Sequence, residues 1–171
     1  MRSGAVQHFA SNVAGIGGFK AKFKAGLGSV NLNGGQVFWG MQSTANALAG
    51  EPSALVNLMA MGFDAADAST GNFFLMYNDG SGTATKVDLG ATNAARAINT
   101  GFMFEILVAP NSSDWYITIT NINTGAQVYK GMVNTNVPAV NTALGFHVQC
   151  RNGAVASAIN VEFSEIVIQP F

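Results

Sequence analysis

Charged side chains are scarce in this chain of 171 residues. Lys, Arg, Asp and Glu make up 10% of it and hydrophobic residues 49%, whereas an average domain carries about 25% charged residues. The surface must therefore consist largely of Asn, Thr, Ser, Gly and Ala. Two explanations are open: weakly charged surfaces are common on extracellular and virion β-proteins, or the surface is buried between subunits, where charge is depleted. The second explanation favours a homo-oligomer.

Several function classes are excluded by what is missing. The formal net charge is −1, so there is no basic field for nucleic acid. Two histidines and one cysteine exclude a multi-histidine zinc site and an intramolecular disulfide, and we expect no cofactor. No apolar run is long enough to cross a membrane, and the first residues lack the apolar core of a signal peptide. The sequence thus predicts synthesis in a cytoplasm and no membrane insertion.

What the chain does have is hydrophobic alternation with a period of two, interrupted by Gly and Asn. Strands are predicted over residues 19–25, 36–42, 57–63, 72–77, 83–89, 102–108, 115–122, 127–133, 143–151 and 155–169. Ten to twelve short strands at hairpin spacing predict an all-β sandwich or closed barrel. We assign residues 17–171 to this domain and residues 1–16 to an N-terminal arm or edge strand. Residues 43–56 are expected to form a loop with about one turn of helix.

Three local patterns carry further expectations. Residues 36–42 and 72–77 have bulky side chains in both alternating sets, so these strands are either central and covered on both sides or face another subunit. Lys20, Lys22 and Lys24 alternate with apolar residues, which is typical of an edge strand guarded by lysine. The alternation loses phase near residues 164–165, which predicts a β-bulge.

Groups for catalysis are few. There is no Gly-x-Ser-x-Gly motif to present a nucleophilic serine. His147 and Cys150 are three residues apart on one strand and so point to opposite faces; we expect His147 at the surface or in an interface and Cys150 in the core. Glu162 and Glu165, with odd spacing, share a face only if the bulge intervenes. The sequence therefore predicts a protein that is not an enzyme, with no catalytic residues.

Binding residues can still be nominated. On strand 143–151, one face carries His147, Gln149 and Arg151 in a row, which suits a glycan, a subunit contact or plain solvated surface. The speculative carbohydrate-binding set is Trp115, Tyr116, His147, Gln149, Arg151 and Asp79. Asp64, Asp67 and Asp79 carry oxygen ligands that could hold calcium, but their role as ordinary turn residues is favoured, and no metal site is assigned.

A series of segments resembles a known family. These are Phe38-Trp39-Gly40-Met41-Gln42-Ser43-Thr44, Glu51-Pro52-Ser53-Ala54-Leu55-Val56-Asn57, Met61-Gly62-Phe63-Asp64-Ala65-Ala66-Asp67, Tyr77-Asn78-Asp79-Gly80-Ser81-Gly82-Thr83, Val87-Asp88-Leu89-Gly90-Ala91 and Ile122-Asn123-Thr124-Gly125. Their order and spacing resemble the lectin-like, concanavalin-A-type domains of tailed-bacteriophage tail fibres and receptor-binding proteins. The resemblance covers roughly residues 17–169.

The resemblance implies a fold and a role. The fold is a two-sheet antiparallel jelly-roll sandwich of the concanavalin A type. The role is a virion adhesion protein, usually trimeric, that contacts other virion proteins and the host cell-surface polysaccharide. A purely structural capsid or tail decoration is the first alternative and a polysaccharide-acting enzyme the second. The acidic metal-binding motif of plant lectins with this fold is not visible, and no catalytic residue is carried over.

Overall fold

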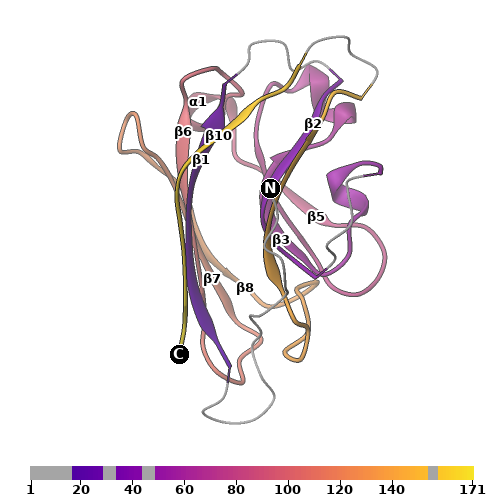
Figure 1. The fold of residues 1–171 in the computed structure, drawn as a ribbon, viewed down its shortest axis with the longest axis vertical. Helices are drawn as coiled ribbons and strands as arrows, with labels where there is room; N and C mark the ends of the chain where they lie inside the picture. The colour runs from indigo at the N-terminus through magenta and orange to yellow at the C-terminus, as the bar shows by residue number, and fades with distance from the viewer. Residues whose placement is uncertain (1–16, 29–33, 44–48, 154–157) are drawn as a thin grey trace.

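The structure consists of two five-stranded antiparallel sheets packed face to face (Figure 1). The computed structural model describes residues 17–28, 34–43, 49–153 and 158–171, so the predicted arm at 1–16 lies outside the described residues. Sheet 1 has the order β10-β1-β6-β7-β8 and sheet 2 the order β5-β4-β3-β2-β9. The predicted jelly-roll sandwich is confirmed.

Most strand bounds follow the sequence alternation, but the last strand, predicted over 155–169, begins at Val161, and residues 158–160 are not part of it. Sheet 1 comprises β1 (Phe19–Leu27), β6 (Gly101–Val108), β7 (Trp115–Asn121), β8 (Gln127–Val133) and β10 (Val161–Pro170). Sheet 2 comprises β2 (Gln36–Gln42), β3 (Leu58–Phe63), β4 (Phe74–Asn78), β5 (Thr85–Asp88) and β9 (Gly145–Arg151). Short helical turns are η1 (Pro52–Ala54), η2 (Ala65–Ser69) and α1 (Ala91–Ala94). No helix in the described ranges is long and apolar enough to cross a membrane.

The core between the sheets is rich in aromatic rings. The Phe73 ring makes edge contacts with Trp39, Phe63 and Phe102, at centroid distances of 5.2, 5.4 and 5.2 Å. Such edge-to-face pairs add to the stabilisation that burial of the rings provides. Because these residues come from both sheets and from the segment before β4, the aromatic cluster joins the two layers.

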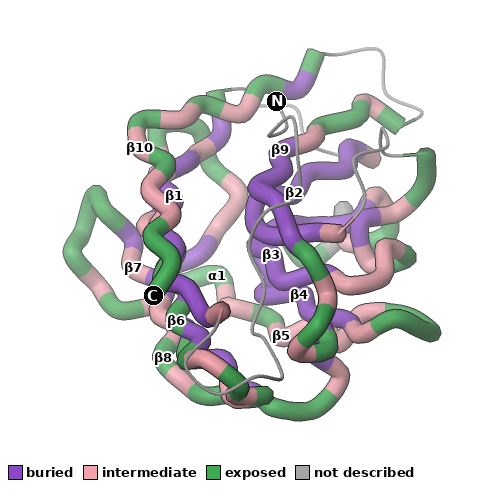
Figure 2. Tube along the Cα trace, turned by 60° about the horizontal axis from the view of Figure 1, so that its bottom comes forward, coloured by how far each residue is buried: buried purple, intermediate pink, exposed green. Residues whose placement is uncertain are grey.

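The central strands of sheet 2 are buried on both of their faces. All residues of β2, β3 and β4 are buried, and Figure 2 shows the tube buried along these strands. Residues 36–42 and 72–77 are therefore central segments covered on both sides, which was the first of the two explanations. Gly40 and Gly62 permit the close packing of neighbouring strands. A Cβ on Gly40 would lie 2.3 Å from the Met59 carbonyl oxygen, and a Cβ on Gly62 would lie 2.2 Å from the Val37 carbonyl oxygen.

Sheet 1 has one wet face, and two expectations about it had different outcomes. The edge-strand interpretation of Lys20, Lys22 and Lys24 is wrong, because β1 lies between β10 and β6; the lysines point to solvent from a central strand. The predicted bulge is confirmed: Lys24 pairs with Glu165 and Ala25 with Phe163, which leaves Ser164 unpaired. The bulge puts Glu162 and Glu165 on the same outer face.

Candidate functional site

The polar row predicted on strand β9 lies on the outer face of sheet 2. Phe146 points into the core, where its ring centroid is 4.7 Å from that of Phe23 in sheet 1. Successive side chains on a strand alternate between faces. His147, Gln149 and Arg151 therefore project together from the opposite face, as the sequence predicted, while Cys150 points with Phe146 toward the inner side.

Strand β2 contributes two further polar side chains to this face. Gln36 is paired with Arg151 and Gln42 with Gly145, so the two glutamines flank the β9 row. Sequence reasoning missed them because strand pairing joins segments about a hundred positions apart. The available signal was their alternation with core-facing residues, but this does not reveal which strand lies beside them.

Burial changes along the row. His147 is 0% exposed, Gln36 5% and Gln42 2%. Gln149 is half-buried and Arg151 is exposed, with its Nη1 donating a 2.6 Å hydrogen bond to the Ala49 carbonyl oxygen. The expectation that His147 lies at the surface or in an interface is wrong, because this face of the sheet is covered. The row thus leads from solvent at Arg151 to a buried imidazole.

Small residues surround the imidazole within the sheet. His147 is paired with Gly40, which in turn is paired with Ala60 on β3. The two side chains next to His147 in this cross-strand row are thus a hydrogen and a methyl group. The imidazole is therefore not crowded by the side chains of its own sheet.

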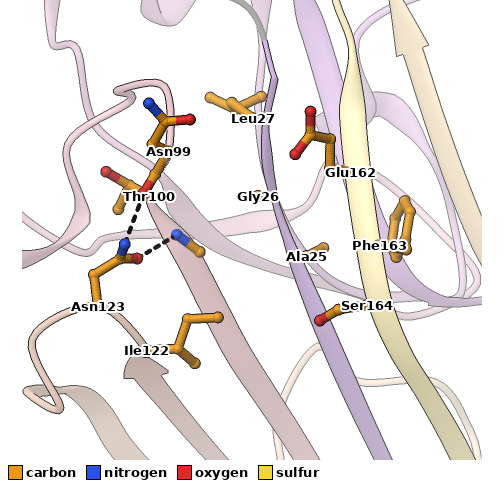
Figure 3. A pocket seen from close by; sticks show the side chains of 11 residues that line it. Ala25, Gly26, Leu27, Asn99, Thr100, Ile122, Asn123, Glu162, Phe163 and Ser164 are labelled. Carbon is orange, nitrogen blue, oxygen red and sulfur yellow. Dashed lines mark hydrogen bonds between the residues drawn. The ribbon is translucent and has the colours of Figure 1, made fainter.

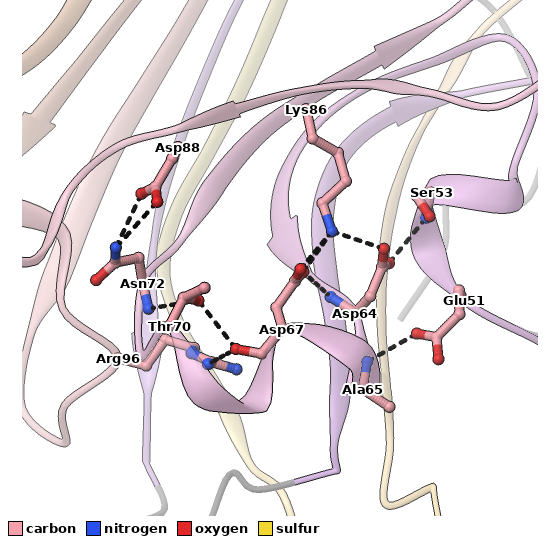
Figure 4. A network of polar contacts seen from close by, with 10 residues as sticks. All are labelled: Glu51, Ser53, Asp64, Ala65, Asp67, Thr70, Asn72, Lys86, Asp88 and Arg96. Atoms are coloured by element: carbon pink, nitrogen blue, oxygen red, sulfur yellow. Dashed lines mark hydrogen bonds and ion pairs between the residues drawn. The ribbon is translucent and has the colours of Figure 1, made fainter.

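At the other end of sheet 2, a network centred on Lys86 closes the edge (Figure 4). The Lys86 Nζ lies 2.8 Å from Asp64 Oδ2 and 2.6 Å from Asp67 Oδ2, and 4.6 Å from the Phe74 ring centroid. Burial lowers the pKa of Lys86, but its hydrogen bonds to the two carboxylates outweigh burial and raise the pKa above the ordinary lysine value. This network stabilises the fold.

The same two carboxylates tie the helical turns to the sheet. Asp64 Oδ1 accepts a hydrogen bond from the Ser53 backbone N–H at 3.0 Å, and Asp67 Oδ2 accepts one from that of Asp64 at 2.8 Å. Arg96 donates from Nη2 to the Asp67 carbonyl oxygen, and burial lowers the pKa of Arg96. Asp64 and Asp67, two residues of the calcium alternative, thus have Lys86 as their counter-ion. Within the described ranges no group of three or more His, Cys, Asp or Glu is placed to hold a metal.

The other nominated sugar-binding residues lie apart from the β9 row. Trp115 is 1% exposed and packs edge-on against Phe19 in the core, at a centroid distance of 5.7 Å, so it presents no face to a ligand. Tyr116 is 50% exposed on the outer face of sheet 1. Asp79 is a turn residue whose Oδ1 accepts hydrogen bonds from the Ser81 N–H and hydroxyl at 2.8 and 3.0 Å. The structure does not bring these three residues together.

The single cysteine lies at the rim of the sandwich. Cys150 is exposed, and its Sγ donates to the Ile159 carbonyl oxygen at 3.3 Å. The expectation that it is a buried core residue is wrong, because β9 is the edge strand of sheet 2 and Cys150 stands near its exposed end. A cavity of about 390 Å³ adjoins it, lined by Val148, Gln149, Cys150, Val161 and Phe163.

Comparison with known proteins identifies relatives of the fold. No protein-family model and no curated protein sequence matches the chain. Among solved structures, it is similar to a family 7 alginate lyase in complex with a product (TM-score 0.58, 10% identity, covering 97% of this chain and 66% of that one). It is also similar to an alginate lyase from Pseudomonas aeruginosa (TM-score 0.56, 10% identity, covering 94% of this chain and 68% of that one). A third neighbour is a carbohydrate esterase from a Shiga toxin-encoding bacteriophage (TM-score 0.50, 16% identity, covering 94% of this chain and 71% of that one).

These neighbours correct the expected function. They establish the concanavalin-A-like jelly roll, and none of them is a tail fibre. The expectation of a non-enzymatic adhesion module is contradicted, since the neighbours are alginate lyases, a peptidase and a carbohydrate esterase, all of them enzymes. The chain spans about two thirds of the length of the alginate lyases that it matches, and at 10–16% identity the likeness itself shows the fold alone.

Proposed function

We propose that the chain is a polysaccharide-acting enzyme, specifically a lyase for polymers of uronic acid, and that its site is the outer face of sheet 2 around His147. The observation that carries this proposal is the row of His147, Gln149 and Arg151 on one face of β9, flanked by Gln36. The similarity of the fold to alginate lyases supports it.

The chemistry of the row supports one reaction class. The outer faces of β2, β3, β4 and β9 carry no Ser, Thr, Cys, Asp or Glu. Hydrolysis by paired carboxylates needs two Asp or Glu, and ester cleavage through a covalent intermediate needs a nucleophile. A histidine with neighbouring amides and an arginine suits a different reaction, in which a base removes the proton next to a sugar carboxylate.

Each group in the row has a role in that elimination. His147 accepts the proton from the carbon beside the carboxylate, a carbon–carbon double bond forms, and the bond to the departing sugar oxygen breaks. The protonated imidazole then gives that proton to the departing oxygen, which restores the neutral base. Gln149 lies two residues from His147, about 7 Å along the strand, and its amide can donate to the carboxylate of the reacting sugar. Arg151 lies about 7 Å further and pairs with the carboxylate of a neighbouring sugar unit.

Burial of His147 sets a condition on binding. A polymer reaches the imidazole only when the atoms that cover this face move aside. The apparent affinity is then lower than the intrinsic affinity by the fraction of molecules that are open. We therefore expect weak apparent binding of long polyuronates, with Arg151, the exposed end of the row, making first contact.

The test is cleavage of alginate and pectate, followed by ultraviolet absorbance of the unsaturated uronate product. His147→Gln should abolish product formation, and Arg151→Ala should raise KM more than it lowers kcat. Lys130→Ala, which removes an exposed cation of sheet 1, is the matched control and should leave both constants unchanged. Absence of unsaturated product from every polyuronate, or full activity of His147→Gln, would refute the assignment.

A further inference from the structure

A second groove lies on the outer face of sheet 1, away from the β9 row. Its volume is about 260 Å³, and it is lined by the ends of β1, β6 and β10 together with the turns at 99–100 and 122–123. Gly26 and Gly101 are paired across β1 and β6. A Cβ on Gly26 would lie 2.6 Å from the Thr100 carbonyl oxygen, so only glycine allows the turn to approach β1 this closely.

One wall of the groove is held in place by Asn123. Its Oδ1 accepts a hydrogen bond from the Gly101 N–H at 2.8 Å, and its Nδ2 donates to the Asn99 carbonyl oxygen at 2.7 Å. These two bonds fix the turn in which Asn99 adopts a φ of 58°. Ile122 is 46% exposed and lies over Gly101, where its Cδ1 is 2.7 Å from the position that a Cβ on Gly101 would occupy. It supplies an apolar contact.

The opposite wall comes from β10. Glu162 is paired with Gly26, and its Oε1 lies 2.6 Å from the position that a Cβ on Gly28 would occupy. Ser164 follows at the bulge. Figure 3 shows Glu162 and Ser164 on one side of β1 and Asn99 and Thr100 on the other. In the part of the chain that the structure describes, the side chains of Asn99, Glu162 and Ser164 make no hydrogen bond, so each is available to a ligand.

From these features we infer that the groove is a binding site for a neutral pyranose, such as a hexose or an N-acetylhexosamine at the end of a glycan. An amide, a carboxylate and a hydroxyl can together satisfy adjacent sugar hydroxyls, while Ile122 contacts the C–H face of the ring. Among the described residues that line the groove, Glu162 alone carries a charge, so it disfavours uronic acids and phosphates. The volume lies below that of sites for drug-sized ligands and suits one sugar ring. This site does not depend on the proposed lyase activity.

The test is a titration of the ¹⁵N-labelled chain, followed by amide chemical shifts. The probes are glucose, galactose, N-acetylglucosamine and glucuronate. At least one neutral sugar should shift the amides of Gly26 and Gly101, and glucuronate should not. Glu162→Ala should weaken binding about tenfold, because it removes a hydrogen bond to a charged group, which is worth at least that much.

Asn99→Gly removes the amide while keeping a residue suited to positive φ, and it should also weaken binding. Asn111→Gly is the matched control, since Asn111 is likewise exposed with a φ of 57°, and it should bind as the wild type does. His147→Gln should keep the shifts, which separates this site from the proposed active site. Lack of shifts with every neutral sugar, an equal response to glucuronate, or unchanged binding by both groove variants would overturn the inference.

Discussion

Replacement of Lys86 by methionine should destabilise the fold strongly. Lys86 is the shared counter-ion of two carboxylates whose side chains are 5% and 12% exposed, at Asp64 and Asp67. Removing one partner of a buried ion pair leaves uncompensated charge and costs about 3–5 kcal/mol. Since the Lys86 side chain is 23% exposed, solvent softens the loss, and we expect about 3 kcal/mol.

The assays are urea unfolding and thermal unfolding, each followed by tryptophan fluorescence. Both indoles report on the core, because Trp39 is 0% and Trp115 1% exposed. For a domain of this size, 1 kcal/mol corresponds to about 2–4 °C, so the melting temperature should fall by roughly 6–12 °C. The triple variant Lys86→Met, Asp64→Asn and Asp67→Asn should recover most of the loss, since it removes the unpaired charges as well.

Lys22→Met is the matched control. Lys22 is also paired with a carboxylate, Glu165, but the two side chains are 29% and 28% exposed, and Glu165 keeps Lys24 at 2.7 Å. Exposed pairs contribute about 0–1 kcal/mol, so this variant should unfold close to the wild type. If Lys86→Met lost under about 1 kcal/mol, or if the control lost as much, the reasoning from burial would be refuted.

Three further predictions test other features. Because the pKa of Lys86 is raised in the folded chain, its contribution to folding stability is complete below the ordinary lysine pKa and is lost as pH rises through the higher folded value. Melting temperatures at alkaline pH should therefore fall more in the wild type than in Lys86→Met. Gly40→Ala should lower the free energy of unfolding in urea by about 3 kcal/mol or more, because its Cβ would meet the Met59 carbonyl oxygen. A Cβ at Gly50 has open space around it, so Gly50→Ala should change this free energy by no more than about 0.5 kcal/mol. Equal losses in the two variants would contradict this reasoning. Cys150 should react with a thiol reagent in the folded chain, and protection until unfolding would show that its exposure is misjudged.

The fold could be predicted wherever one face of a strand is wet. In β6 and β7, alternating residues are buried without interruption, and the same alternation is visible in the sequence. In β2 and β4 both sets are buried, so the alternation vanishes and only bulk and length mark the strands. The lysines of β1 illustrate a different limit: a solvated face looks the same in sequence on an edge strand and on a central one.

The candidate site was predictable in part for the same reason. A period of two places His147, Gln149 and Arg151 on one face, but it does not say whether anything covers that face. Solvent exposure was therefore misjudged in both directions, for His147, which is buried, and for Cys150, which is exposed. The pairing of Gln36 with Arg151 depends on the order of strands in the sheet, which no local pattern encodes.

Burial of both faces of the central strands of sheet 2 also bears on the shortage of charge. Strands β2, β3 and β4 leave almost no surface on which Lys, Arg, Asp or Glu could reach water, so part of the depletion follows from the fold of one chain. The trimer remains a prediction, and light scattering tests it. A mass of one chain would make this burial a sufficient explanation. Because the central strands of sheet 2 are already covered on both sides, a mass of three chains would place the contact between subunits on the sheet edges or on the outer face of sheet 1. On that face Leu107, Tyr116 and Met132 are 39%, 50% and 47% exposed.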